Sequence, residues 1–355
     1  MYGTITKYIG TAYTGKGLAH KYEEIIQQAS ETIFLKCPPT TRLSTMLNKL
    51  AAHFVKQGYH VDKFMNSTQT DEVDAVYIHD VKRFYLQASH PVALEPVYIG
   101  GRHHVISFYD MYNEQKLQEA HKEISELLQL TERHSGKALE ALENAIGRHD
   151  QLEQINIEKM DWPQHEQLIE TLKQNIFQSI QLNKSSTCTD RIVSSLTASG
   201  ATDFFSEITY RMEKRYMIKG FAGTGKSTMM RAIATEAERR GLDVLYGWCG
   251  LDPDGIDLIQ LPELSVAIFD ATHPHAYEVE RVGDEVVDVT AICKAEEVDV
   301  EVVEPIQNAY REDILNATAH LQSFAQAEKK LKIFMDQAIE NSMFQKKYEK
   351  LIDLN

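Results

Sequence analysis

Eight consecutive residues in the second half of the chain match the pattern G-x-x-x-x-G-K-[ST], a loop that cradles the phosphates of a nucleotide. They are Gly220, Phe221, Ala222, Gly223, Thr224, Gly225, Lys226 and Ser227, and Thr228 follows them. The glycines let the backbone curl so that consecutive N–H groups point at phosphate oxygens. Lys226 would reach the β- and γ-phosphates, and the Ser227 hydroxyl would ligate Mg²⁺. The loop therefore predicts binding of ATP or GTP with Mg²⁺.

A carboxylate that completes such a site should end an apolar strand beside the loop. The run Ser265-Val-Ala-Ile-Phe-Asp270 has this pattern, and its aspartate follows Lys226 by 44 residues. We therefore expect Asp270 to hold Mg²⁺, either directly or through water.

The loop lies between an expected strand and an expected helix, as its mechanism requires. The expected elements are a strand over 215–219, a helix over 227–240 closed by Gly241, and strands over 242–248 and 264–269. Apolar strands that alternate with helices predict an α/β fold, with a parallel sheet covered by helices on both faces.

The chain repeats itself at a spacing of 183 residues. From Thr14 to Gly100, 20 of 87 positions carry the same residue as the position 183 further on, without a gap. The first copy accordingly has expected elements over 32–36, 45–57 and 81–86. We predict two tandem P-loop NTPase-like domains, over 1–183 and 190–355, joined by the Ser/Thr-rich stretch Asn183–Asp190.

Each copy continues into a helical extension. Apolar residues recur there at helical spacing and indicate core or copy-to-copy packing. In the first copy they are Leu117, Ile124, Leu128, Leu142, Ile146, Leu152, Ile169, Leu172, Ile176 and Ile180; in the second they are Ile306, Tyr310, Ile314, Ala317, Leu321 and Phe324. Asp161, which precedes Trp162-Pro163, predicts the start of one of these helices.

The first copy has lost the residues of the phosphate loop. Its equivalent stretch, Cys37-Pro-Pro-Thr-Thr-Arg-Leu-Ser44, replaces the glycines with Cys37, Thr40 and Arg42, and the lysine with Leu43. Gln87 stands where the second copy has Asp270. Two prolines also lack the N–H groups that such a loop uses. We predict that the first copy does not bind a nucleoside triphosphate.

This disabled copy serves as an internal control for the histidines. His273-Pro274 recurs as His90-Pro91, which favours a structural turn after the third strand. His275 corresponds to Val92 and lies five residues after Asp270, near the expected γ-phosphate. It is therefore the candidate to orient water or a substrate, and the catalytic set becomes Lys226, Asp270 and His275. A surface histidine without a role is the alternative.

The same control applies to other polar residues. Asp254 and Asp257 recur as Asp71 and Asp74 and are interpreted as structural, whereas Asp252, lost as Gln69, is a weaker functional candidate. Ser227 recurs as Ser44, which a helix-capping role would explain.

The bulk properties restrict the partners. A net charge of −15 argues against a nucleic-acid backbone as the main partner. The four cysteines form no C-x-x-C pair, so reduced thiols in a cytoplasmic protein are expected. No signal peptide and no apolar stretch of membrane-spanning length is found in the sequence, so no membrane is expected as a partner.

Two such units in tandem, each opened by T-x-x-G (Thr14 to Gly17, Thr197 to Gly200), resemble a bacterial family of tandem P-loop ATPases, often labelled nucleotide-kinase-like. The resemblance extends to the runs 252–257 and 270–275 and covers most of the chain. In that family the first loop can be intact, whereas here it is degraded. The family has no established substrate, so the resemblance implies the fold more than the function.

Three functions fit these observations. The first is hydrolysis of ATP by the second copy, with the first copy as a pseudo-site that could supply an arginine from Arg42, Arg83 or Arg102. The second is a small-molecule or nucleotide kinase. The third is a non-catalytic nucleotide switch or scaffold, because Ala271 stands where many ATPases have a water-activating glutamate. The sequence leaves homo-oligomer formation and the choice between ATP and GTP open.

Overall fold

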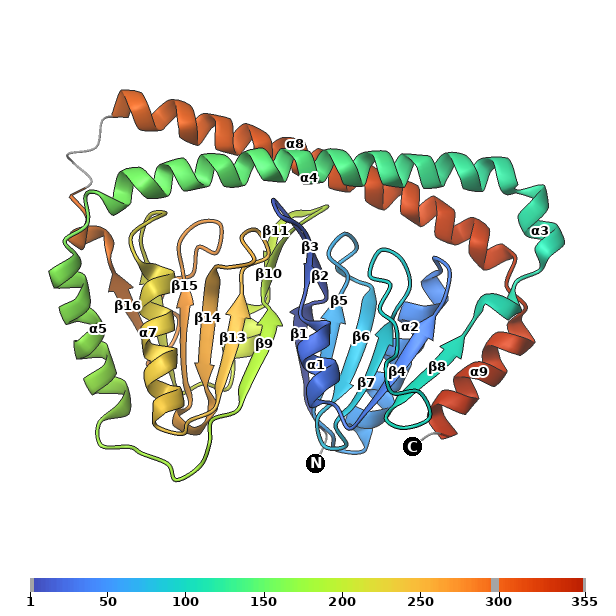
Figure 1. The fold of residues 1–355 in the computed structure, drawn as a ribbon, viewed down its shortest axis with the longest axis horizontal. Helices are drawn as coiled ribbons and strands as arrows, with labels where there is room; N and C mark the ends of the chain where they lie inside the picture. The colour runs from blue at the N-terminus through green and yellow to red at the C-terminus, as the bar shows by residue number, and fades with distance from the viewer. Residues whose placement is uncertain (1–2, 295–299, 354–355) are drawn as a thin grey trace.

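The computed structural model describes residues 3–294 and 300–353, in which two similar halves share one sheet (Figure 1). The strands of the first half are β1 (Ile5–Ile9), β2 (Thr11–Thr14), β3 (Gly17–His20), β4 (Glu31–Lys36), β5 (Val61–Met65), β6 (Val73–Ile78), β7 (Arg83–Gln87) and β8 (His103–Ser107). The second half repeats them as β9 (Cys188–Ile192), β10 (Ser194–Thr197), β11 (Gly200–Asp203), β12 (Lys214–Lys219), β13 (Val244–Trp248), β14 (Ile256–Leu261), β15 (Val266–Asp270) and β16 (Asp284–Asp288). Every strand from β1 to β7 begins 183 residues before its counterpart, so the repeat is confirmed.

The helices follow the same repeat. The first half has α1 (Tyr22–Gln28), α2 (Thr41–Lys56), α3 (Glu114–Glu119), α4 (His121–Ile157) and α5 (Trp162–Phe177); the second has α6 (Phe205–Thr209), α7 (Lys226–Arg239), α8 (Val300–Gln337) and α9 (Asn341–Asp353). Three short 3-10 helices are also present among the described residues: η1 (Tyr109–Met111), η2 (Pro262–Leu264) and η3 (Thr290–Ile292). Asp161 caps α5 as predicted, because its side chain accepts a hydrogen bond from the Gln164 amide.

The sheet is mixed, which corrects the prediction of a parallel sheet. Its twelve strands lie in the order β16-β12-β15-β14-β13-β9-β1-β5-β6-β7-β4-β8. β6 and β14, which were not predicted, run antiparallel to both of their neighbours. Only residues 79–82 connect β6 to β7, and only 262–265 connect β14 to β15. Links of this length allow a hairpin but no crossover between parallel strands.

The two halves meet at β1 and β9 in the middle of the sheet. These strands run antiparallel, and their register includes the pair Ile9 and Ile192. Each half therefore continues the sheet of the other across this central seam, as Figure 1 shows.

Alternate strand residues face two different cores, and helices cover both faces as predicted. In β4, Ile33 and Leu35 pack with α2, whereas Phe34 packs with Tyr22 and Ile25 of α1. The second half repeats this arrangement with α7 on one face and α6 on the other. The phosphate loop consequently connects a strand and a helix that are both fixed by packing.

The helical extensions are exchanged between the halves. α4 leaves the first half and crosses to the second, where α5 packs Ile169, Leu172 and Phe177 into the core beneath α7 (Figure 1). α8 returns alongside α4, and α9 packs Leu351 into the core of the first half. Each predicted domain therefore has a helical extension, but that extension covers the other half.

The predicted copy-to-copy packing is confirmed along these long helices. Ala138 and Leu142 of α4 share a buried cluster with Ala317 and Leu321 of α8. Leu128 and Ile180, which belong to the same periodic set, are instead exposed. Within the described ranges, no helix combines the length and the apolar character that crossing a membrane requires.

Candidate functional site

The phosphate loop lies between the end of β12 and the start of α7. Gly223 and Gly225 have φ angles of +78° and +79°, which only glycine adopts readily. Phe221 is exposed, and so is Thr228 on the first turn of α7. The side-chain hydroxyl of Thr224 donates to the Phe221 carbonyl at 2.8 Å and ties the loop internally. The curled backbone and the helix start give the geometry of an anion cradle.

The structure brings Lys226 and Asp270 together, as the sequence predicts. β15 pairs in parallel with β12, with Asp270 opposite Ile218, so Asp270 lies beside the start of the loop. The Lys226 ammonium donates to the carbonyls of Gly220 and Phe221 at 2.7 and 2.9 Å, and lies 3.5 Å from the Asp270 carboxylate. This ammonium is held inside the loop. A bound phosphate could accept its hydrogen bonds in place of the two carbonyl oxygens.

Ser227 has a role that the sequence did not reveal. Its hydroxyl accepts a 2.9 Å hydrogen bond from the Ile256 amide, and Ser44 accepts one of the same length from Val73. The predicted helix-capping role is wrong, because Ser227 lies inside α7 and Gly225 is the N-cap residue. The hydroxyl ties the helix to the adjacent strand in both halves. Its hydrogen and remaining lone pair stay available for a ligand in the second half.

Thr272 is a site residue that sequence reasoning missed. Its hydroxyl donates to the Gly220 carbonyl at 3.0 Å and accepts from the Gly220 amide at 3.1 Å. Its own amide donates to Asp270 at 2.8 Å. In the first half, Ser89 makes the equivalent contact by accepting from the Cys37 amide at 2.7 Å. A small hydroxyl residue at the same place in both copies was the available signal.

His275 is not a surface histidine, since its side chain is 11% exposed. Its Nδ1 lies 3.0 Å from the Asp203 carboxylate, and its Nε2 lies 3.7 Å from Asp257. Burial acts against the protonated ring, but the carboxylates of Asp203 and Asp257 outweigh it and raise the pKa of His275. The site therefore favours the imidazolium form more than water does, which suits a positive charge or a proton donor better than a general base.

Asp257 belongs to this cluster, although the sequence suggested only a structural role. It accepts a 2.6 Å hydrogen bond from the Ser194 hydroxyl, and burial raises the pKa of Asp257. Asp252 instead pairs at the surface with Lys16 of the other half, at 3.4 Å. Asp254 pairs with the same lysine at 2.5 Å, so both residues link the halves.

His273 lies in the turn after β15, as predicted. The peptide bonds before Pro274 and Pro91 are both cis, so the two halves share this turn. His273 itself is exposed. The structure thus separates it from His275, which points into the carboxylate cluster.

The exchanged α4–α5 segment covers the phosphate loop. The Asn156 side chain donates to the Ala222 carbonyl at 2.8 Å. A side chain at Gly223 would meet the Glu153 carbonyl at 2.4 Å, and one at Gly225 would meet His165 at 2.7 Å. His165 is 1% exposed, and among the described residues its Nε2 has no hydrogen-bond partner. Residues of α4 and α5, which belong to the first half of the sequence, therefore cover the phosphate loop of the second half.

The first half presents a different surface at the equivalent loop. Leu43 is fully buried in the core, so the position of the lysine has become part of the packing. The hydroxyls of Thr40 and Thr41 both donate to the Asp336 carboxylate of α8. A carboxylate of the chain itself thus occupies the start of α2, the place where a helix N-terminus would hold phosphate.

The three arginines considered for the second site contact residues around the first half. Arg42 donates to Asn341 of α9, Arg83 pairs with Glu31 at 2.6 Å, and Arg102 lies over the Tyr98 ring. The geometry therefore selects none of them as a contributor to the loop of the second half.

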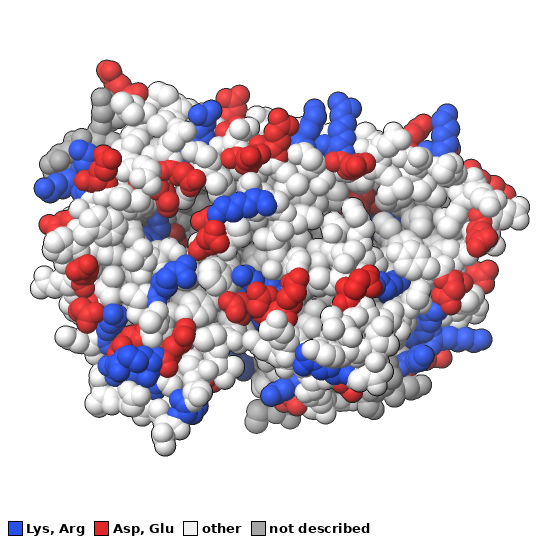
Figure 2. Space-filling model, in the orientation of Figure 1, with Lys and Arg blue, Asp and Glu red and all other residues white. Residues whose placement is uncertain are grey.

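Acidic and basic side chains are interspersed on the face shown in Figure 2, and they form no extended basic patch there. No protein-family model matches the chain, and no curated protein or solved structure is significantly similar to it. The chemistry of the site is therefore argued from its geometry.

Proposed function

We propose that the second half binds a Mg²⁺–nucleoside triphosphate, ATP or GTP, at the loop Gly220–Ser227 and hydrolyses it. The observation that carries this proposal is the Lys226 ammonium, held in a glycine-rich loop 3.5 Å from the Asp270 carboxylate. A cation and an acidic metal ligand at the mouth of an N–H cradle are the parts that phosphoryl transfer needs.

The residues divide the work as follows. The loop amides and the start of α7 hold the phosphate oxygens, and Lys226 leaves the carbonyls of Gly220 and Phe221 to contact the β- and γ-phosphates. Ser227 and Asp270 fit Mg²⁺, because hydroxyl and carboxylate oxygens are the ligands that this ion prefers. When bound, Mg²⁺ neutralises charge on the phosphate oxygens. Thr272 fixes the position of Asp270 relative to Gly220, because it forms hydrogen bonds to both residues, three in all.

His275 supplies a positive charge rather than a base. Attack of water on the γ-phosphorus forms a new P–O bond and breaks the bond to the β–γ bridging oxygen, and the products are a nucleoside diphosphate, inorganic phosphate and a proton. An imidazolium held by Asp203 and near Asp257 can orient that water or stabilise the negative charge of the transferred group.

A nucleotide-dependent switch is the second candidate, and one observation favours it. Asn156 and Glu153 of the exchanged helix α4 lie against Ala222 and Gly223, so phosphate binding and the position of α4 are coupled by contact. Ala271 supplies no water-activating carboxylate, which fits slow turnover.

A nucleotide panel separates these functions. Phosphate release and binding are measured for ATP, GTP, CTP and UTP with Mg²⁺, using wild type and Lys226→Ala. Lys214→Ala is the matched control, because Lys214 starts the same strand β12 and pairs with Glu285 at the end away from the loop. Turnover lost only in Lys226→Ala supports hydrolysis, and binding without turnover supports the switch. Turnover that survives Lys226→Ala would rule out hydrolysis at this loop.

A further inference from the structure

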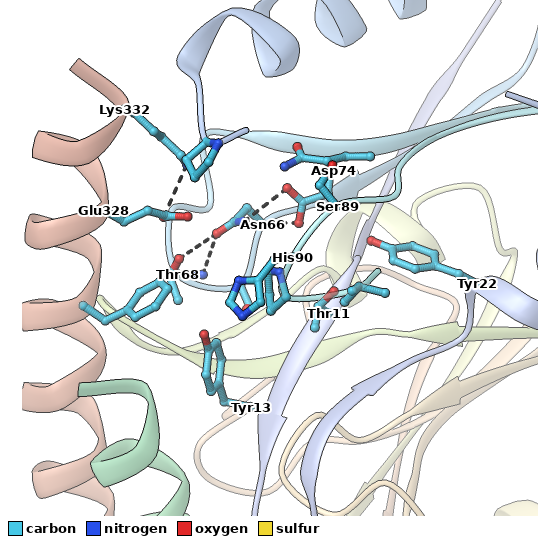
Figure 3. Close-up of a pocket in the computed structure, with 16 residues that line it drawn as sticks. Thr11, Tyr13, Tyr22, Asn66, Thr68, Asp74, Ser89, His90, Glu328 and Lys332 are labelled. Atoms are coloured by element: carbon cyan, nitrogen blue, oxygen red, sulfur yellow. Dashed lines mark hydrogen bonds and ion pairs between the residues drawn. The ribbon is translucent and has the colours of Figure 1, made fainter. Parts of the chain in front are cut away.

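The first half contains a cavity at the place that corresponds to the phosphate site of the second half. Its volume is about 60 Å³. Asp74, Gln87 and Ser89 line it, and they stand 183 residues before Asp257, Asp270 and Thr272. Figure 3 shows the cavity between α8, which carries Glu328 and Lys332, and the strand ends that carry Thr11 and Asp74. The first half has lost the phosphate loop and kept a polar cavity beside it.

A buried hydroxyl in this cavity lacks a hydrogen-bond partner. Tyr22 is 1% exposed, and among the described residues its Oη has no partner with hydrogen-bonding geometry, although the Thr11 hydroxyl lies close enough to interact with it. The second half has Phe205 at the equivalent position, so packing alone does not require the hydroxyl. Burying an unpaired hydroxyl costs free energy, which a ligand contact would offset.

The oxygens of Tyr22 and Asp74 lie close to each other. A side chain built at Gly10 would lie 2.4 Å from Tyr22 Oη and 3.5 Å from Asp74 Oδ2, so both oxygens are near the same part of the backbone. Within the described part of the chain, the Asp74 carboxylate accepts hydrogen bonds from one side-chain donor, Asn66 Nδ2, at 3.2 Å from each oxygen. Both acceptors therefore have capacity for further donors.

The charges around the cavity sum to a negative value. Lys332 is 5% exposed and lies 2.5 Å from the Glu72 carboxylate and 3.3 Å from that of Glu328. One ammonium thus faces two carboxylates, and the carboxyl group of Asp74 lies beside them. Burial raises the pKa of Asp74 to about 7, as expected of a carboxylate without a cation of its own.

Aromatic side chains complete the wall. Tyr13 and Phe324 line the cavity together, with ring centroids 5.9 Å apart. Rings beside a carboxylate favour an organic cation, which combines charge with an apolar chain. A water needs roughly 10–15 Å³ of such volume, so the cavity can take a ligand of a few heavy atoms.

We propose that this cavity binds a small primary ammonium, R–NH₃⁺ with a short carbon chain. Its N–H groups donate to the Asp74 carboxylate and to Tyr22 Oη, and its chain packs on Tyr13 and Phe324. An ammonium has three donors, which suit the free lone pairs of the Asp74 carboxylate and of Tyr22 Oη. The site is separate from the phosphate loop of the second half and does not depend on the function proposed there.

Calorimetric titration of the full chain with methylammonium and ethanolammonium chloride tests this proposal. Ethylene glycol serves as the neutral analogue of the second probe, and potassium and magnesium chlorides test for a metal site. Saturable binding of the amines alone is the expected result. Equal binding of ethylene glycol, binding of a metal ion in place of the amines, or no saturable amine binding would each overturn the proposal.

Three variants locate the site. Asp74→Asn should weaken amine binding by about tenfold to a hundredfold, because it removes a charge-assisted hydrogen bond. Tyr22→Phe installs the residue that the second half already carries, so it keeps the fold and should weaken binding by several-fold. Asp71→Asn, at an exposed aspartate three residues from Asp74, is the matched control and should bind as wild type does.

Unchanged amine affinity in both Tyr22→Phe and Asp74→Asn, with the fold of each variant retained, would contradict the assignment.

Lys226→Ala should bind the amine with unchanged affinity. This result distinguishes the cavity from the phosphate loop, whatever the loop binds. Loss of amine binding in Lys226→Ala, with the fold retained, would place the amine at the other site and refute the proposal.

Discussion

Asn156 in the last turn of α4 donates a hydrogen bond to the carbonyl oxygen of Ala222, so the loop of the second half is held by a helix from the first. At the corresponding loop of the first half, the hydrogen bonds run in the opposite direction, from the loop to the long helix. There Asp336 of α8 accepts hydrogen bonds from the hydroxyls of Thr40 and Thr41. Each half thus covers the loop of the other, and only one of the two loops retains the glycines and the lysine of the motif.

The exchange predicts that neither half is stable alone. A chain ending at residue 183 would expose α5, whose apolar residues belong to the core of the second half. Each large apolar side chain left in water costs about 1.5–3 kcal/mol. Halves 1–183 and 184–355, when produced together, should form a 1:1 complex in size-exclusion chromatography with light scattering. A monomeric 1–183 fragment that unfolds cooperatively would contradict this expectation.

The two repeats supply a matched pair of serines. Ser44→Ala and Ser227→Ala each leave a strand amide without its acceptor, and each should lower the free energy of unfolding by about 1–3 kcal/mol. Only Ser227→Ala should also weaken nucleotide binding in the presence of Mg²⁺. Urea denaturation measures the first effect, and titration of nucleotide with and without Mg²⁺ measures the second. A similar loss of nucleotide affinity in Ser44→Ala would show that the effect comes from the fold.

The His275–Asp203 pair predicts a pH dependence of stability. The pKa of His275 is raised in the folded state, so its stabilising contribution is complete below about 6.5, the value for an unperturbed histidine. It is lost as the pH rises through the folded-state value. The pKa of Asp203 is lowered, so the pair also loses stability in acid as that carboxylate takes up a proton.

The measurement compares wild type with His275→Gln by urea denaturation at several pH values. The difference in unfolding free energy should be about 1–3 kcal/mol near pH 6 and smaller near pH 9. His273→Gln, two residues away and exposed, is the control and should show little difference at either pH. A His275→Gln difference that grows with pH would mean that the ring is neutral in the folded protein.

The sequence predicted the elements whose pattern is local. The loop, Asp270 and the flanking strand and helix follow from residue types at fixed spacing, and the repeat follows from direct comparison of the two halves. β14 was missed because Ile256–Leu261 follows a turn-rich segment and forms a strand only by pairing with β13 and β15. Such pairing depends on contacts that the local pattern does not encode.

Long-range relations explain the remaining differences. The apolar stripe of α5 predicts a buried helix but does not specify which half buries it. The partners of His275 come from two separate strands, β11 and β14, which the fold brings to the same place. Thr272 could have been found, because Ser89 stands at the same place in the first copy.

The central claim is that Lys226 binds the phosphates of a nucleotide, and that the loop Gly220–Ser227 is the one nucleotide site of the chain. The most direct test is calorimetric titration of Mg²⁺–ATP and Mg²⁺–GTP into wild type, Lys226→Ala and the Lys214→Ala control. We predict one site per chain for at least one of the two nucleotides in wild type and in the control. Its affinity should fall by about tenfold to a hundredfold or more in Lys226→Ala, as expected when charge-assisted contacts to phosphate are removed. Two sites per chain, or an affinity that Lys226→Ala leaves unchanged, would contradict the account.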